Sequence, residues 1–138
     1  MKVLIDTNIA LNKLLQQPNF YNGSNAIFKL AEIGKIVGYI SASAVTDIYY
    51  ITRKSLGKIS AIEAMKELLS IYQPATVTDK NIYKALDLDW DDFEDSVQYI
   101  VGESLDLDYI ITWNTSDFSK GNIPSVTPEQ FIEIITDI

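Results

Sequence analysis

The chain has 138 residues, of which 47% are hydrophobic and 22% charged, a composition typical of a folded globular protein. Its net charge of −8 argues against diffuse binding to nucleic acid. Cysteine and histidine are both absent, which excludes disulfide bonds, most zinc sites and Ser-His-Asp catalysis, so that hydrolysis would depend on carboxylates, a metal ion and water.

The first half of the chain alternates strand-like and helix-like segments. Its apolar and capping patterns predict a strand over residues 2–5, helices over 8–17 and 24–34, a second strand over 36–40, and a helix over 44–55 with Ser43 as its cap. Between the first two helices, Asn19 to Ser24 is the most loop-like segment and could be a mobile flap.

The second half continues this alternation. Ser60-Ala61-Ile62-Glu63 has the pattern of a capping box and predicts a helix to about residue 72. There follow a short strand over 75–77, helices over 79–88 and 91–105, a strand over 109–112, a short strand at Val126, and a last helix over 128–138 with Thr127 as its cap. The sequence therefore predicts a single α/β domain over residues 1–138, with helices on both faces of a parallel sheet of four to five strands.

The N-terminus gives no sign of a targeting segment. Lys2 begins a strand directly, without the longer apolar stretch of a signal peptide. Nowhere does an apolar stretch approach the about 20 residues that a membrane helix requires. We therefore expect a cytoplasmic protein that does not associate with membranes.

Four aspartates lie next to the predicted strands and helices at positions far apart in the sequence: Asp6 after the first strand, Asp47 near the start of the helix after the second, Asp95 in the first turn of the helix that leads into the fourth, and Asp117 after that strand. Ligands of an open parallel sheet bind at the carboxyl ends of its strands, so all four can face one edge. Such carboxylates favour Mg²⁺ or Mn²⁺, which lowers the pKa of a bound water and supplies a nucleophile without histidine.

Each acid also has an ordinary explanation. Asp6 could cap the first helix, Asp47 could complement a helix dipole, and Asp117 could belong to a capped turn. Asp92 is more naturally a helix cap than a ligand, whereas Asp95 lies among apolar residues and is harder to explain as a solvated side chain. Each alternative stays open for its own residue, but the occurrence of all these acids at one predicted edge favours a shared site.

Neutral polar residues flank the acids and could orient the carboxylates or contact a scissile phosphate: Thr7, Asn8, Thr112 and Asn114. Turn formation is the alternative role, above all for Asn8. Positive charge is concentrated at Arg53, Lys54 and Lys58, which could form a phosphate-contacting rim or simply a solvated helix end.

Three segments carry a resemblance to a known family: Leu4-Ile5-Asp6-Thr7-Asn8, Asp92-Phe93-Glu94-Asp95-Ser96-Val97-Gln98, and Ile110-Ile111-Thr112-Trp113-Asn114-Thr115-Ser116-Asp117-Phe118. Together they resemble the PIN-domain family, most closely its VapC-like toxin branch, over essentially the whole chain. The resemblance implies a three-layer α/β/α sandwich and a Mg²⁺- or Mn²⁺-dependent endoribonuclease. It also implies a homodimeric toxin that a cognate antitoxin protein binds and inhibits.

Carried over by motif, the metal-binding acids would be Asp6, Asp95 and Asp117, with Asp47 at a position where the family usually has glutamate. Thr112 and Asn114 match the family's polar residues after the fourth strand. Asp47 is one methylene shorter than glutamate, so it could hold the metal through water.

Trp113 stands where arginine is common in this family, which removes a positive group near the site. Its indole could stack on a base, but we favour a packing role. An apolar patch at Ile48, Tyr49, Tyr50 and Ile51 is a candidate antitoxin surface, with ordinary core residues as the alternative.

Two other functions compete with a toxin ribonuclease. One is a non-catalytic α/β module that binds a protein partner, such as a receiver-like signalling domain with Asp6 as a cation site. A receiver needs a lysine after a later strand, and none directly follows Ile111. The other is a metal-dependent phosphatase, whose frequent Asp-x-Asp start is missing because Thr7 and Asn8 follow Asp6.

Overall fold

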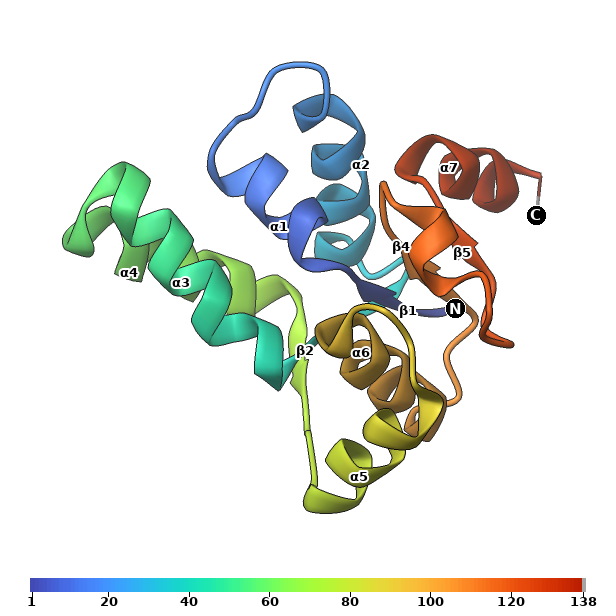
Figure 1. The fold of residues 1–138 in the computed structure, drawn as a ribbon. Coiled ribbons are helices and arrows are strands. Elements are labelled where there is room, and N and C mark those ends of the chain that lie inside the picture. Colours follow the sequence, from blue (N-terminus) through green and yellow to red (C-terminus); the bar gives the residue numbers. More distant parts are fainter. Residues whose placement is uncertain (138) are drawn as a thin grey trace.

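In the computed structural model, which describes residues 1–137, the chain forms a parallel five-stranded sheet (Figure 1). The strands are β1 (Lys2–Ile5), β2 (Val37–Ser41), β3 (Gln73–Ala75), β4 (Tyr109–Ile111) and β5 (Ser125–Val126). Their spatial order is β3-β2-β1-β4-β5, and each neighbouring pair is parallel. The strand order therefore reverses between β1 and β4, which is where open α/β sheets bind their ligands.

Helices cover both faces of the sheet, as Figure 1 shows. They are α1 (Thr7–Leu14), α2 (Tyr21–Glu32), α3 (Ala42–Leu56), α4 (Lys58–Ile71), α5 (Asp79–Leu88), α6 (Phe93–Ser104) and α7 (Pro128–Thr136), with the short 3₁₀-helix η1 (Thr115–Phe118) after β4. Side chains of α5 and α6 belong to one hydrophobic cluster, and those of α1, α2, α3, α4 and α7 belong to another. The predicted three-layer α/β/α arrangement is thus confirmed.

The central strand β1 contributes to both hydrophobic clusters. Val3 and Ile5 are completely buried in the larger cluster, and Leu4 is completely buried in the smaller one. Successive side chains of a strand point to opposite faces, so each face of β1 is covered by a helical layer. The residue that follows this tightly held strand, Asp6, consequently has a well-defined position.

The prediction of a loop-like flap over residues 19–24 is wrong for most of this segment, which is helical. Helix α2 begins at Tyr21 rather than at Ser24. Phe20, directly before the helix, packs edge-to-face against Trp113 with 5.2 Å between ring centroids. This tertiary contact holds the start of α2 in place although the local sequence is rich in turn residues.

Helices α3 and α4 begin earlier than their capping signals indicate. Ser41, not Ser43, occupies the N-cap position of α3, and α4 begins at Lys58, so that Ser60 is not a cap. Between them Gly57 has a φ of 83°, which lets the chain reverse within one residue. The two helices form a hairpin, the α3–α4 hairpin, that projects from the rest of the molecule (Figure 1).

Two helix starts agree with their predicted caps. Asp92 accepts a hydrogen bond at the start of α6, and Thr127 forms a capping box before α7. Helix α5 begins at its predicted residue, where Thr78 forms a capping box that was not predicted. The expected end of the last helix at Ile138 lies outside the described residues. Strand β3 begins two residues before its predicted range because its pairing with β2 starts at Gln73.

Among residues 1–137, no helix combines the length and the apolar character that crossing a bilayer would require.

Candidate functional site

The carboxyl ends of β1 and β4 meet where the strand order reverses. The backbone N–H of Asp6 donates to the carbonyl oxygen of Ile111 at 2.9 Å, so the pairing of these strands extends to the first residue after β1. Asp6 also caps helix α1. Asp6 therefore does cap a helix, as the alternative explanation held, and it also lies at the edge of the sheet where ligands bind.

Asp6 is the most enclosed of these acids, with only 6% of its surface exposed, and four donors hold its carboxylate. Oδ1 accepts from the backbone N–H of Thr7 at 2.7 Å and from Nε2 of Gln98 at 3.1 Å. Oδ2 accepts from the hydroxyl of Thr112 at 2.8 Å and from Nδ2 of Asn8 at 3.4 Å. These donors come from α1, α6 and the end of β4, and together they fix the orientation of the carboxylate.

Asp95 lies half-buried in the first turn of α6, close to several other acids. Burial, and after it the negative charges of Asp6, Asp92, Asp117 and Glu94, together raise its pKa to about 7. The Asp92 side chain accepts from the backbone N–H of Asp95 at 3.1 Å, so Asp92 caps the helix as the alternative reading proposed. Asp95 thus lies close enough to Asp6 and Asp117, two of the acids expected to converge with it, for their charges to interact.

Glu94 also belongs to this cluster, although the sequence analysis assigned it no role. Its Oε1 accepts from the Thr7 hydroxyl at 3.1 Å. Burial raises the pKa of Glu94, the Thr7 hydrogen bond partly opposes this, and the charges of Asp47, Asp6 and Asp92 raise it again. Thr7 therefore contacts two carboxylates, because its hydroxyl donates to Glu94 and its backbone N–H donates to Asp6.

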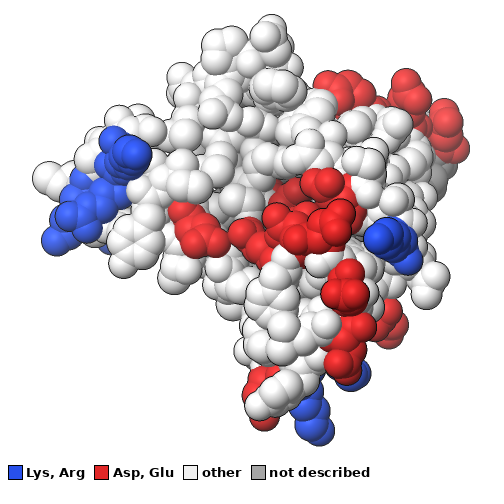
Figure 2. Space-filling model, viewed as in Figure 1, with Lys and Arg blue, Asp and Glu red and all other residues white. Residues whose placement is uncertain are grey.

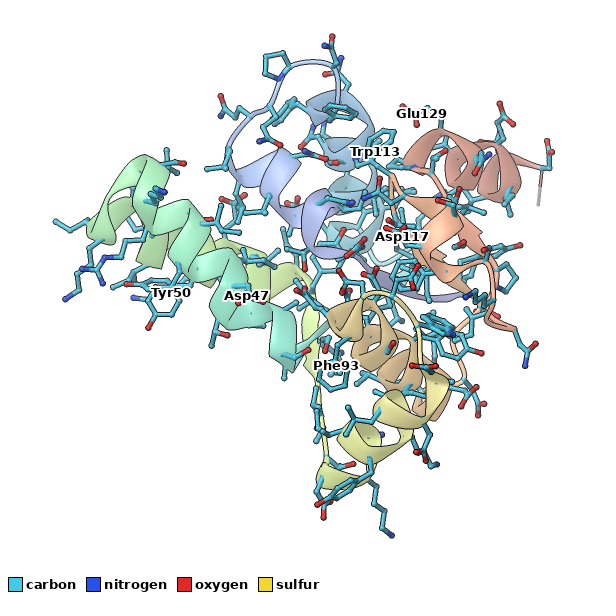
Figure 3. The ribbon with its side chains drawn as sticks, viewed as in Figure 1. Asp47, Tyr50, Phe93, Trp113, Asp117 and Glu129 are labelled. Carbon is cyan, nitrogen blue, oxygen red and sulfur yellow. The ribbon has the colours of Figure 1, made fainter. Side chains whose placement is uncertain are left out.

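Asp47 and Asp117 are exposed on opposite sides of this cluster, as Figure 3 shows. Asp47 lies in the second turn of α3 rather than the first, because the helix begins earlier than predicted. Asp117 lies in η1 and is followed by Phe118, whose burial anchors this short helix. Figure 2 shows the acids as a band across this face of the molecule.

A pocket of about 120 Å³ opens at one side of the acidic band. It is lined by Trp90, Asp91, Asp92, Asp95, Ser116, Asp117 and Lys120. Lys120 supplies a positive charge next to two of the predicted metal ligands, a position that the sequence analysis did not consider. This lysine follows a 3₁₀-helix, and its sequence context offers no signal that it would face the acids.

The positive residues that were considered, Arg53 and Lys54, are exposed near the end of α3. Figure 2 shows the basic side chains of this tip well separated from the acidic band. The structure therefore does not bring Arg53 and Lys54 to the predicted metal ligands.

The donor set suits a hard divalent cation in its chemistry. Carboxylates and neutral oxygen atoms are the ligands that Mg²⁺ and Mn²⁺ favour, and mutual repulsion among the acids is what a cation would relieve. Within residues 1–137, however, no three acidic groups stand close enough together to form a ready-made metal site. Metal binding would consequently require the side chains of the half-buried Asp95 and the exposed Asp117 to turn toward the fixed Asp6.

Gln98 is a second residue whose role was missed. It is completely buried in α6, and its amide holds Asp6 across 92 residues of sequence. Helical spacing could have suggested it, because residues three or four positions apart share a helix face and Gln98 follows Asp95 by three. Asn114 takes part through its backbone N–H, which donates to the Thr112 hydroxyl at 3.0 Å.

The predicted surface patch on α3 is only partly correct. Ile48 is completely buried and belongs to the core, whereas Tyr50 and Ile51 are exposed. Trp113 is half-buried against Phe20, in agreement with the packing role that we favoured for it.

Comparison with known proteins places these features in context. A family model for the PIN domain matches residues 2–116. The fold is similar to the crystal structure of VapBC2 from Rickettsia felis bound to a DNA fragment from its promoter, with a TM-score of 0.72, 18% identity, and 92% of this chain and 98% of that chain covered. None of the curated proteins compared with the chain matches it.

Two further solved structures share this fold. One is the Sarcin-Ricin loop cleaving toxin VapC20 from Mycobacterium tuberculosis, with a TM-score of 0.70, 13% identity, and 86% of this chain and 95% of that chain covered. The other is a toxin–antitoxin complex from Klebsiella pneumoniae, with a TM-score of 0.67, 20% identity, and 91% and 97% covered. At these identities the likeness establishes a common fold.

Proposed function

This chain belongs to the PIN domain family, and on that premise we propose that it is a metal-dependent endoribonuclease, the toxin of a toxin–antitoxin pair. The observation that carries the proposal is the convergence of acids from four parts of the chain on the carboxyl edge of the sheet. Asp6, held by four donors, is the fixed centre of this group.

We assign the metal to Asp6, Asp95 and Asp117, with Asp47 and Glu94 completing the opposite side of the site. When bound, Mg²⁺ or Mn²⁺ would lower the pKa of a water molecule and neutralise charge on the phosphate. The electrostatic interaction of Asp95 with both Asp6 and Asp117 supports this assignment.

The remaining residues act on these acids or on the RNA. Thr112, Asn8 and Gln98 keep the Asp6 carboxylate in one orientation, and Asp92 holds the start of α6 and hence Asp95. Lys120 is the basic side chain best placed to contact a phosphate, because it lines the acidic pocket. Arg53 and Lys54 would contact only RNA that extends along α3.

The two complexes among the structural neighbours suggest a protein partner for this chain as well. On the α3–α4 hairpin, a shallow hollow of about 500 Å³ is lined mainly by apolar parts of Tyr49, Ile62, Met65, Lys66, Leu69 and Ser70. Tyr50 and Ile59 on the same hairpin are 64% and 77% exposed. We propose this hairpin as the antitoxin surface and a homodimer as the state of the free toxin, which light scattering would test.

The function is tested with purified protein and labelled RNA, including single-stranded transcripts and the Sarcin-Ricin loop that VapC20 cleaves. Cleavage should require Mg²⁺ or Mn²⁺, stop with EDTA, and disappear in Asp95→Asn and Asp117→Asn. Asp87→Asn is the matched control, because it makes the same charge change at an exposed position of α5. Cleavage that survives EDTA, or that Asp87→Asn also abolishes, would contradict the proposal.

A further inference from the structure

A second pocket lies beside Asp6 and is lined by different residues from the acidic one. Its lining residues are Asn8, Asn12, Phe20, Trp113 and Asn114, and its volume is about 210 Å³. We call it the asparagine pocket. All of its lining side chains are neutral, and its volume lies below the about 300–1,000 Å³ of pockets for drug-sized ligands. It suits a single planar group.

Two hydrogen bonds link the asparagine pocket to the candidate metal ligands. Asn8 donates from Nδ2 to Oδ2 of Asp6 at 3.4 Å, and the backbone N–H of Asn114 donates to the hydroxyl of Thr112 at 3.0 Å. Thr112 in turn donates to the same Oδ2 of Asp6. A group in this pocket would therefore lie next to Asp6, the fixed ligand of the proposed metal site.

Three lining residues carry buried polar atoms that have no hydrogen-bond partner within the described chain: Oδ1 of Asn8, Oδ1 of Asn12 and Nε1 of Trp113. The orientation of each amide follows from its nitrogen, which donates to Asp6 in Asn8 and to Gln17 in Asn12. Asn12 is only 6% exposed, so water does not readily satisfy its oxygen. Buried polar groups are normally paired, so three unpaired polar atoms among the residues that line one pocket favour a polar ligand there.

An aromatic ring stands at the rim of the pocket. Phe20 is 43% exposed although it is a large apolar side chain. Behind it, Trp113 packs edge-to-face against the ring and holds it in place. Figure 3 shows Trp113 beside α2, on the same side of the molecule as Asp117. A rigid, exposed ring next to a phosphate site is the arrangement on which unpaired bases stack.

We propose that the asparagine pocket binds one unpaired nucleobase of the RNA, next to the cleaved phosphodiester, with the base stacked on Phe20. This inference rests on the proposed ribonuclease function. Two acceptor oxygens and one indole donor match the edge of guanine, which offers N–H groups beside a carbonyl oxygen. Guanine is accordingly the preferred base.

The negative charge of the protein makes contacts to a base important for RNA affinity. With a net charge of −8 and Lys120 as the basic residue of the acidic pocket, phosphate contacts contribute little to RNA affinity. Stacking and hydrogen bonding to a base do not depend on the charge of the protein. The pocket would thus supply affinity and sequence preference together, which a set of phosphate contacts could not.

A binding experiment tests the pocket without any cleavage. Guanosine and uridine, both uncharged, are titrated into the ¹⁵N-labelled protein, and the indole N–H resonance of Trp113 is followed by NMR. We expect guanosine to shift this resonance and to bind at least about fivefold more tightly than uridine. Phe20→Ala should weaken guanosine binding about tenfold or more, whereas Phe20→Trp, which keeps a stacking ring, should restore most of it.

The matched control is Tyr83→Ala, which removes an exposed aromatic ring from α5, away from the pocket. It should leave guanosine binding unchanged, and circular dichroism should show all variants folded. An absent guanosine effect on Trp113, or equal losses in Phe20→Ala and Tyr83→Ala, would overturn the proposal.

A cleavage experiment then connects the pocket to the reaction. Random-sequence single-stranded RNA is digested with Mn²⁺, and the cut positions are sequenced. Wild type should show guanosine enriched at one fixed position beside the cut, and Phe20→Ala should cut more slowly and lose this enrichment. Active cleavage with no base preference would contradict the pocket. An inactive wild type that still binds guanosine would contradict the ribonuclease function instead, so the two failures are distinguishable.

Discussion

The acidic edge of the sheet and the α3–α4 hairpin depart from an ordinary protein surface in opposite ways. The first gathers like charges, so that neighbouring carboxylates add to burial in raising the pKa of Asp95. The second exposes large apolar side chains such as Tyr50 and Ile59. Each arrangement is unfavourable in the isolated chain and would be relieved by a different ligand, a cation in one case and an apolar protein surface in the other. Each proposed binding site is thus a place where the free protein is locally unfavourable, through charge repulsion at the acidic edge and through apolar exposure on the hairpin.

The largest expected effect separates activity from stability at the acidic edge. Asp95→Asn should lower RNA cleavage by about 10²–10³-fold or more, because it removes a proposed metal ligand. In the metal-free protein at pH 8 the same change should raise stability, because it removes a repelled charge. Cleavage rates and thermal denaturation with EDTA check both signs. A variant that loses activity and stability together would indicate a mainly structural role for Asp95.

Asp6 should behave differently from Asp95 although both are proposed ligands. Its carboxylate accepts four hydrogen bonds, so in Asp6→Asn the amide nitrogen would face donors such as Gln98 or Thr112. We expect Asp6→Asn to lower stability by about 1–3 kcal/mol, the typical cost of unsatisfied buried polar groups. Chemical denaturation of both variants measures this contrast, and equal stabilities would show that the hydrogen bonds around Asp6 are unimportant.

Substitutions on the α3–α4 hairpin should weaken binding of the partner protein and leave RNA cleavage intact. Changing Tyr50 and Ile62 to lysine should weaken antitoxin binding by about 30-fold or more, as for central interface residues. RNA cleavage should stay within about twofold of wild type, because neither residue lies at the acidic edge. Tyr83→Lys on α5 is the control. Surface plasmon resonance with the cognate antitoxin measures the affinity, and undiminished binding would place the partner elsewhere.

A smaller effect concerns pH. The pKa of Asp95 is raised from its ordinary value of 3.8 to about 7, so the folded state holds this proton more tightly than the unfolded state. Stability should therefore fall as pH rises from about 4 to 7, by about 1–2 kcal/mol once solvent screening of this half-exposed group is allowed for. Urea denaturation of the metal-free protein should show the slope, and Asp95→Asn should reduce it. If Asp95→Asn leaves the dependence of stability on pH unchanged, other titrating groups cause it.

The smallest effect distinguishes the two sets of basic residues. Lys120→Gln should raise the KM for RNA several-fold and reduce the salt dependence of binding, because one phosphate contact is lost. Arg53→Gln and Lys54→Gln should change KM less on a short RNA, since they lie at the far tip of the hairpin. Measurements at several salt concentrations compare the three variants. A larger effect at Arg53 would mean that RNA binds along α3.

Much of the acidic edge could be anticipated because its signals are local. A carboxylate directly after a buried strand, as at Asp6, and another in the first turn of a capped helix, as at Asp95, are positioned by the element next to them. The parallel sheet follows in the same way from alternating strand and helix patterns. These features need no knowledge of distant contacts.

The features that were missed depend on long-range contacts. Gln98 reaches Asp6 only because α6 packs beside the end of β1, and the segments are 92 residues apart in sequence. The start of α2 is fixed by the contact of Phe20 with Trp113, and the tip that carries Arg53 is directed away from the acids by the hairpin. The start of α4 was misplaced because the sharp turn at Gly57 begins this helix directly, and the start of α3 was misplaced because that helix follows the end of β2 at Ser41 without a loop.

The most direct test of a shared cation is a titration of the metal-free protein with Mn²⁺, followed by electron paramagnetic resonance. Wild type and Asp87→Asn should bind Mn²⁺ with equal affinity, whereas Asp95→Asn and Asp117→Asn should each bind it at least about tenfold more weakly. Equal binding by all four proteins, or no binding by wild type, would contradict the claim that these carboxylates hold one metal ion together.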